Sequence, residues 1–309
     1  MNAPLPPVVT DDYVFLVGRP PISEYISFVQ TMAVDGHSIE QGTLAQHWRQ
    51  ASVRVAEIEA AEAGAANDPP LQEVPVDMQP FVARVTADSA FQSTFSNVPT
   101  GFFLVEIDRL VVFQKFINLG FVEELKGSLS ATPGSADIAR LAFGLDRPQP
   151  GVTIRQAGNG VFQFVSASSD IRPLEATLIE PTKVLDFKTS GRIQAFVGMS
   201  VGFGTNFLNA LQVEGRLVLH NGSHRAYALR ALGVTHAPCI VQQVTSRDEL
   251  DFVGSGDIQQ NPDRYLKVSR PSMLRDYFDP QLTRVFPVAR KNRMVQVQVS
   301  ASVTEIPGA

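Results

Sequence analysis

The segment Leu211–Val244 constrains the fold of this chain more than any other part of the sequence. It reads LQVEGRLVLHNGSHRAYALRALGVTHAPCIVQQV. Apolar runs at Arg216–His220 and Pro238–Val244 predict two strands, and Ala226–Leu232 between them has a helical composition. Asn221-Gly222 breaks the first strand, and Gly233 stands where a helix favours a left-handed cap. The sequence therefore predicts a strand, a glycine turn, a helix and a second strand.

The start of this predicted helix has the chemistry of an anion site. Ser223 can cap it, and the first backbone N–H groups of a helix attract anions together with its dipole. Gly222 lets an anion approach the backbone, while Arg225 offers a planar fork and His224 a donor or proton-transfer group. The residues leave two interpretations open: a phosphate site at Asn221, Gly222, Ser223, His224 and Arg225, or a capped helix with a surface arginine.

His220–Gly233 (HNGSHRAYALRALG) resembles the G-x-H-R helix-start motif shared by ParB N-terminal domains, sulfiredoxins and ParB-like serine kinases. HAPCIVQ resembles the next strand of that family, and Val105–Leu110 followed by Gln114 is similar to its opening strand and nearby glutamine. The resemblance implies an α/β to α+β protein with a ParB/sulfiredoxin-like mixed sheet as its core. It also implies that Gly222, Ser223, His224 and Arg225 hold the phosphates of a nucleotide such as ATP, ADP or CTP, with magnesium.

The resemblance does not identify which activity of the family this chain would have. Sulfiredoxins place a reactive cysteine directly before the His-Arg pair, but Ser223 stands there, so sulfinic-acid repair is disfavoured. Related serine kinases use a carboxylate as base, which Glu106, Asp108 or Glu214 could supply. His224 and Glu106 are the candidate catalytic residues of an NTP-hydrolysing enzyme or small-molecule kinase. The alternative is a non-catalytic, nucleotide-switched scaffold associated with DNA; a purely structural descendant of the fold is a third.

The net charge and the cysteine content limit the kinds of partner, metal site and cell compartment that the sequence is compatible with. The formal charge of −5 provides no broad positive field for DNA, so any DNA contact must be local, for example at Arg290–Arg293. The single cysteine, Cys239, excludes an intrachain disulfide and a four-cysteine zinc site, and histidine spacing suggests no protein-only metal site. A reducing cytoplasm fits best. The N-terminus does not resemble a signal peptide, and no apolar run approaches the ~18 residues that a membrane helix needs.

The domain organisation expected from the sequence has three parts. Residues 1–80 form a helical region, with an apolar stripe at Leu44–Ile58 and a Pro- and acid-rich linker from residue 60; this stripe favours intramolecular packing, although a homodimer stays open. Residues 81–250 form the nucleotide-binding core with an inserted hairpin around Asn159-Gly160. Residues 251–309 form a C-terminal extension. Within the core, Phe102–Val112 is strand-like, Phe116–Leu129 is helical, and Gly198–Gly204 is a loop that could cover a ligand.

Overall fold

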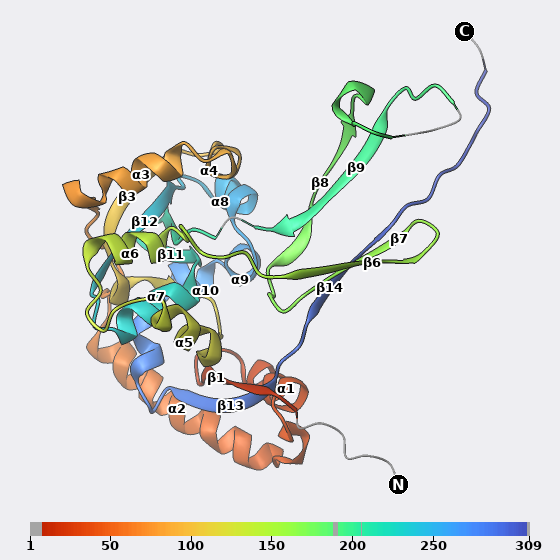
Figure 1. The fold of residues 1–309 in the computed structure, drawn as a ribbon. Coiled ribbons are helices and arrows are strands. Elements are labelled where there is room, and N and C mark those ends of the chain that lie inside the picture. The colour runs from red at the N-terminus through yellow and green to blue at the C-terminus, as the bar shows by residue number, and fades with distance from the viewer. Residues whose placement is uncertain (1–7, 188–190, 205, 308–309) are drawn as a thin grey trace. The chain divides into compact units, whose positions relative to one another are not determined.

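The computed structural model describes residues 8–187, 191–204 and 206–307. The expectation that the N-terminus is not a signal peptide concerns residues 1–7 in part, and these lie outside the described residues. The protein is of the α+β class, and it divides into two compact units (Figure 1). Unit 1 contains residues 1–147 and 205–290, and unit 2 contains residues 148–204 and 291–309. The divisions at 147, 204 and 290 differ from the expected three parts, and the expected linker at 60–80 lies inside unit 1.

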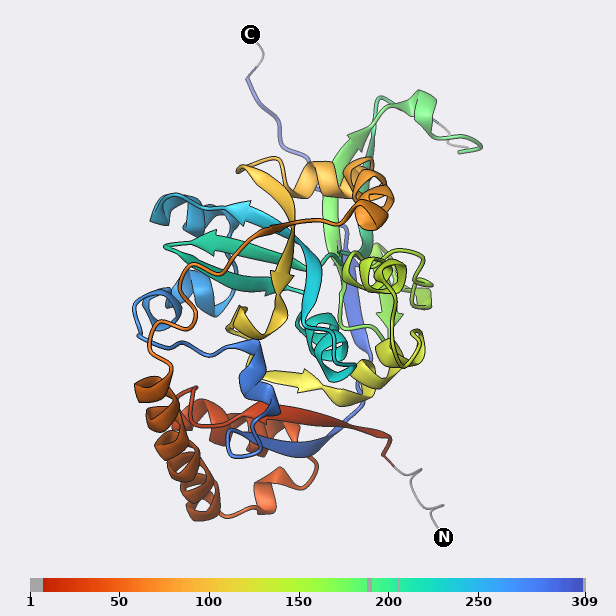
Figure 2. The same cartoon turned by 90° about the vertical axis from the view of Figure 1, so that its left-hand side faces the viewer.

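A six-stranded mixed sheet organises unit 1 (Figure 2). Its strand order is β2-β3-β12-β10-β11-β4, and only the pairs β10–β12 and β11–β4 are parallel. The bounds are β2 Gln72–Glu73, β3 Thr100–Glu106, β12 His236–Gln243, β10 Asn209–Val213, β11 Arg216–Asn221 and β4 Val111–Val112. The helix α7, Ser223–Ala231, connects β11 to β12. The strand–turn–helix–strand unit predicted from the sequence is confirmed.

A second sheet in unit 1 pairs the first strand of this unit with its last strand. Its order is β13-β1-β5, with bounds Thr283–Ala289, Thr10–Leu16 and Phe116–Asn118. The helices α1 (Ile22–Met32) and α2 (Gln41–Ala61) cover it, because Phe15, Tyr25, Leu44, Ala51 and Phe286 form one buried cluster. The stripe on α2 thus packs inside the chain, as the sequence favoured.

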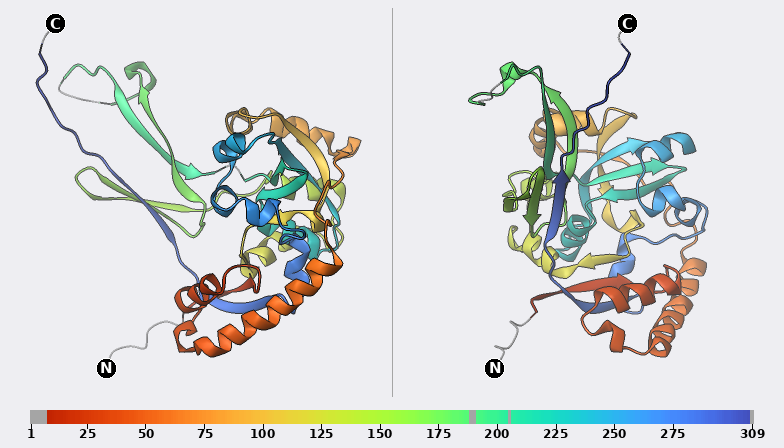
Figure 3. Two further views of the ribbon diagram at one scale, coloured as in Figure 1. Left: turned by 180° about the vertical axis from the view of Figure 1, so that it is seen from behind. Right: turned by 90° about the vertical axis from the view of Figure 1, so that its right-hand side faces the viewer.

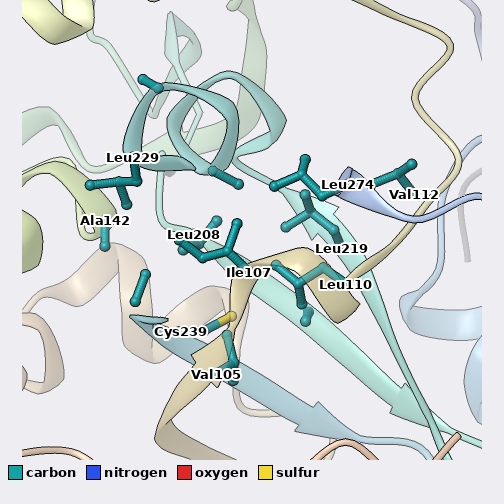
Figure 4. Packing of buried hydrophobic residues seen from close by; sticks show 14 of the residues in the cluster. Val105, Ile107, Leu110, Val112, Ala142, Leu208, Leu219, Leu229, Cys239 and Leu274 are labelled. Atoms are coloured by element: carbon teal, nitrogen blue, oxygen red, sulfur yellow. The ribbon is translucent and has the colours of Figure 1, made fainter. Parts of the chain in front are cut away.

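The main core of unit 1 lies between the six-stranded sheet and α7 (Figure 4). Val105, Leu219 and Cys239 from three strands meet Leu229 of α7 there, and each is almost fully buried. Burial of each large aliphatic side chain stabilises the fold by roughly 1.5–3 kcal/mol. The other elements of unit 1 are α3 Gln79–Thr86, α4 Ser89–Thr94, α5 Leu119–Gly127, α6 Ser135–Ala142, α8 Arg247–Val253, α9 Asp257–Gln260, α10 Asp263–Leu266, and the short 3₁₀ turns Gly36–Ser38, Val76–Met78, Ile107–Arg109 and Leu274–Phe278.

Unit 2 consists of two small antiparallel sheets (Figure 3). One has the order β14-β7-β6, with bounds Arg293–Gln298, Val161–Ser166 and Val152–Gly158. The other pairs β8, Ile171–Ile179, with β9, Phe196–Phe203, and a 3₁₀ turn at Pro181–Lys183 follows β8. Gly160 has φ +69° between β6 and β7, so the hairpin expected at Asn159-Gly160 is confirmed.

Two expectations about single segments were partly correct, and a third was wrong. Phe102–Val112 is interrupted by the 3₁₀ turn at Ile107–Arg109, where the Ile107 N–H donates to the carbonyl of Thr235. Phe116–Leu129 begins as β5 before α5 starts. Gly198–Gly204 is mostly strand β9, because its backbone pairs with β8; it is not a covering loop of the expected kind.

Within the described ranges, no helix is both long enough and apolar enough to cross a membrane.

Candidate functional site

The glycine turn between β11 and α7 is a tight, left-handed connection. Gly222 has φ +93° and ψ +21°, and α7 begins at the next residue. A Cβ atom on Gly222 would lie 2.8 Å from Cδ1 and 3.0 Å from Cα of Leu208, which is fully buried. Both the backbone angle and the close approach of Leu208 therefore require glycine.

The helix starts earlier than the sequence indicated, and a different residue occupies its N-cap position. Gly222 is the N-cap, and no side chain caps the helix, so the expected capping role of Ser223 was wrong. The first intrahelical bond runs from the Ala226 N–H to the Gly222 carbonyl, 2.9 Å apart. The N–H groups of Ser223, His224 and Arg225 precede that bond and belong to the helix start, where N–H groups have no intrahelical acceptor. The side chain of Asn221 accepts from the Gly222 N–H at 2.7 Å.

Arg225 is buried in the first turn of α7, with 3% of its surface exposed. Gly144, which has φ +60°, lies beside its guanidinium: a Cβ there would be 3.2 Å from Nη2 of Arg225 and 2.7 Å from the carbonyl oxygen of Asn206. Burying a guanidinium is costly unless oppositely polarised groups surround it. The surface-arginine interpretation was therefore wrong, because the segment that follows α6 closes over this side chain.

His224 is oriented by a contact that the sequence did not reveal. The backbone N–H of Asn118 donates to its Nε2 at 3.0 Å, and its ring meets Phe121 edge to face at 5.3 Å between centroids. Burial, reinforced by the charge of Arg225, lowers the pKa of His224 to about 4. The imidazole is therefore neutral at pH 7, its Nε2 is an acceptor, and Nδ1–H is the donor that remains for a ligand.

Arg147 adds a second guanidinium near the helix start. Its Cζ lies 4.6 Å from the centroid of Phe121, the ring that also contacts His224. Asn118 positions this group, since its Oδ1 accepts from the Phe121 N–H and caps α5. Asn118, Phe121 and Arg147 were missed at the level of sequence. The capping asparagine was the only local signal, and nothing linked it to residue 224.

The candidate acids do not gather at the turn. Glu106 pairs in register with His236, which follows the C-terminal end of α7. Asp108 lies at the same end, because Nε of Arg230 in the last turn of α7 is 2.6 Å from its Oδ1. A nine-residue helix is about 13 Å long, so Glu106 and the turn lie at opposite ends of α7. Glu214 is in the β10–β11 turn with Lys267 and Arg247, whose hydrogen bonds lower its pKa.

Two other groups singled out in the sequence have internal partners. Cys239 is fully buried in β12, and burial raises the pKa of its thiol. In the basic cluster, Arg290 pairs with Asp11 at 2.7 Å and Arg293 donates to the carbonyl of Ser169. Among the residues that the structure describes, no three His, Cys, Asp or Glu side chains are grouped as metal ligands.

Comparisons with protein-family models, with curated proteins and with solved structures found no match for this chain.

Proposed function

We propose that this chain is a ParB/sulfiredoxin-like nucleotide-binding protein that holds phosphate at the Gly222–Arg225 turn. The observation that carries the proposal is the geometry of this turn: a left-handed glycine, forced by Leu208, leads directly into a nine-residue helix whose first turn contains a buried arginine. Helix N-termini with a close glycine approach favour phosphate because N–H groups and the helix dipole converge there.

The surrounding groups favour binding of an anion over proton transfer at the turn. Arg225 and Arg147 supply positive charge, and Nδ1–H of His224 supplies a directed donor. Glu106, Asp108 and Glu214 lie elsewhere in unit 1, so phosphoryl transfer would need a base from the acceptor or from another part of the protein. Magnesium would arrive with the nucleotide and neutralise its phosphate oxygens.

A thermal-shift panel tests this proposal on the full chain. ATP, ADP, CTP and GTP are added with magnesium, and the ligand-induced change in Tm is measured for the native protein, Arg225→Ala and Arg230→Ala. A ligand at 100 times its Kd stabilises the folded state by about 2.7 kcal/mol. We expect at least one nucleotide to raise Tm in the native protein and in Arg230→Ala, with the shift lost in Arg225→Ala.

Arg230 is the matched control because it lies on the same helix, in the last turn, where it pairs with Asp108. Arg225→Ala lowers the Tm of the unliganded protein as well, so the quantity compared is the shift caused by ligand. If no nucleotide at millimolar concentration raises Tm, or if Arg225→Ala keeps the full shift, the proposal is wrong.

A further inference from the structure

The strand β11 ends at the Gly222 turn. On the face of β11 away from α7, a serine, a histidine and an asparagine are in contact one after another. Oγ of Ser255 is 2.8 Å from Nε2 of His220, and Nδ1 of His220 is 3.3 Å from Nδ2 of Asn209. Asn209 in turn lies 3.4 Å from Oε1 of Gln242. The chain of contacts thus runs from an exposed hydroxyl through an imidazole to two buried amides.

We infer that Ser255 is an activated nucleophile for acyl transfer, with His220 as its base and Asn209 as the positioning residue. The natural electrophile is a neutral ester or thioester with an apolar or aromatic acyl group. This activity is separate from phosphate binding at the Gly222 turn.

The contacts around His220 suit a general base. A hydroxyl becomes an effective nucleophile when an imidazole nitrogen lies within hydrogen-bond reach and a third group orients the ring. Burial lowers the pKa of His220, so the ring is neutral near pH 7 and can accept a proton. Phe113, with its ring centroid 6.4 Å from that of His220, packs beside the imidazole.

The orientation of the two amides decides which ring nitrogen carries the proton. Rotating the side-chain amide groups of Asn209 and Gln242 by 180° exchanges their nitrogen and oxygen atoms at nearly the same positions. Oδ1 of Asn209 then accepts from Nδ1–H of His220 and from Nε2 of Gln242. In this arrangement Nε2 of His220 is free to accept the Ser255 proton.

The loop that carries Ser255 needs a glycine on each side of it. A Cβ on Gly254 would lie 2.5 Å from the Leu250 carbonyl oxygen, and Gly256 has φ +63° with Phe113 3.4 Å from the position of its Cβ. These two glycines hold the exposed serine against the His220 ring. In the proposed step, the backbone N–H groups of Ser255 and Gly256 would stabilise the oxyanion.

Unit 1 has a cavity of about 340 Å³ whose wall includes Asp257, two residues after Ser255. Phe113 and Asp257 are both part of its wall, and Trp48 and Tyr265 add two more aromatic side chains. Ligand pockets commonly measure roughly 300–1,000 Å³, so this cavity is large enough for the acyl group.

Charge favours a carbonyl electrophile over a phosphoryl donor. The segment Arg247–Asp257 carries four acidic residues and one basic residue. The basic side chains in the cavity wall are paired with acids, through the contacts Arg19–Glu59, Lys115–Glu24 and Arg264–Asp257. A polyanionic donor would therefore be repelled from Ser255, whereas a neutral ester would not.

The step balances without a cofactor. Oγ of Ser255 forms a bond to the carbonyl carbon while its proton passes to Nε2 of His220. The bond from that carbon to the alcohol or thiol then breaks, and His220 returns the proton to the leaving group. Water releases the acyl group by the same route.

The test uses a fluorophosphonate probe on the full chain. Oγ attacks phosphorus, fluoride leaves, and the proton passes to His220, so the label marks an activated serine whatever the natural ester is. We expect one label per chain, located at Ser255 by peptide mass spectrometry, and none there in Ser255→Ala. A general base contributes about 10²- to 10⁴-fold, so His220→Gln should slow labelling at least a hundredfold.

Two further variants separate chemistry from stability. Asn209→Ala should slow labelling, whereas Asn209→Asp should restore it, because a carboxylate also accepts from Nδ1–H; a merely structural role would not give this rescue. Ser38→Ala is the control, since Ser38 is exposed and its Oγ donates to the Asp35 carbonyl; its labelling rate should match that of the native protein. Hydrolysis of 4-nitrophenyl butyrate with a burst should follow the same order.

The inference is overturned if Ser255 is not labelled, if another serine takes the label, or if His220→Gln is labelled at the native rate. Nucleotide thermal shifts on the same samples report the Gly222 turn alone, so failure of one proposal leaves the other standing.

Discussion

Replacing Gly222 by alanine tests the geometry on which the phosphate proposal depends. Two effects add. A non-glycine residue in the left-handed region costs about 1–2 kcal/mol. The new Cβ would also press on Leu208, at 2.8 Å from Cδ1 and 3.0 Å from Cα, and overpacking of a well-packed site costs about 1–3 kcal/mol.

Leu208 cannot easily move away. Its side chain is fully buried, its N–H donates to the Ala142 carbonyl at 2.7 Å, and its carbonyl accepts from the Ile240 N–H at 3.0 Å. We therefore expect Gly222→Ala to lower the free energy of unfolding by about 2–5 kcal/mol, the sum of the two effects.

Gly233→Ala is the matched control, because it isolates the backbone effect. Gly233 follows the same helix with φ +80°, and nothing lies within 4 Å of the position of its Cβ. Its substitution should cost only the conformational part, about 1–2 kcal/mol. Both changes remove a similar amount of unfolded-state entropy, so this contribution cancels in the comparison.

Urea unfolding followed by the fluorescence of Trp48 provides the measurement. Trp48 is the only tryptophan and lies in unit 1, so the signal reports the unit that contains the turn. The midpoint should fall clearly further for Gly222→Ala than for Gly233→Ala. Equal losses would mean that the approach of Leu208 imposes nothing on this turn, and the argument for a glycine-dependent site would fail.

Three further predictions concern buried groups. The pKa of His224 falls from 6.5 to about 4 on folding, so His224 binds a proton in the unfolded chain at a higher pH than in the native protein. The native protein should therefore lose on the order of 3 kcal/mol of stability between pH 6.5 and pH 4. Urea titrations should show a smaller loss for His224→Gln. Cys239 should react with a thiol reagent only after denaturation, since burial raises the pKa of its thiol; rapid labelling of the native protein would contradict its placement. Asp276→Ala should destabilise unit 1 by about 3–5 kcal/mol in urea, because it leaves the almost fully buried Arg270 without the two 2.6 Å contacts to this carboxylate, and a change below 1 kcal/mol would refute that ion pair.

The local part of the site could be predicted from the sequence because local rules determine it. Alternating apolar residues in Arg216–His220, the Asn221-Gly222 break and Gly233 each act within a few residues of their position. The same rules misplaced the helix start by three residues, since a left-handed Gly222 lets the helix begin without a capping side chain. The break within Phe102–Val112 was not predicted, because its apolar residues continue through the 3₁₀ turn at Ile107–Arg109. Ile107 in this turn and Leu110 directly after it both face the core.

The non-local part could not be predicted, because it depends on strand order. Glu106 is at the wrong end of α7 because β3 runs antiparallel to β12, a pairing across more than a hundred residues. Arg225 is buried by the segment after α6, and His224 is held by Asn118; neither contact has a signal in the spacing of residues. Ser255 and His220, likewise, are 35 residues apart and meet only in the folded chain.

The strand β11 separates the two proposed sites although they begin two residues apart. Side chains alternate along a strand, so Leu217 and Leu219 pack in the cluster beneath α7 while Val218 packs in the cluster that contains Val111 and Leu250. His220 shares the face of Val218, whereas Gly222 leads the chain onto the face covered by α7. A one-residue shift of β11 would exchange these faces and bury His220 under the helix. The alternating apolar residues of β11 therefore specify the observed register. The register that places the Gly222 turn on one face therefore also presents His220 to Ser255 on the other.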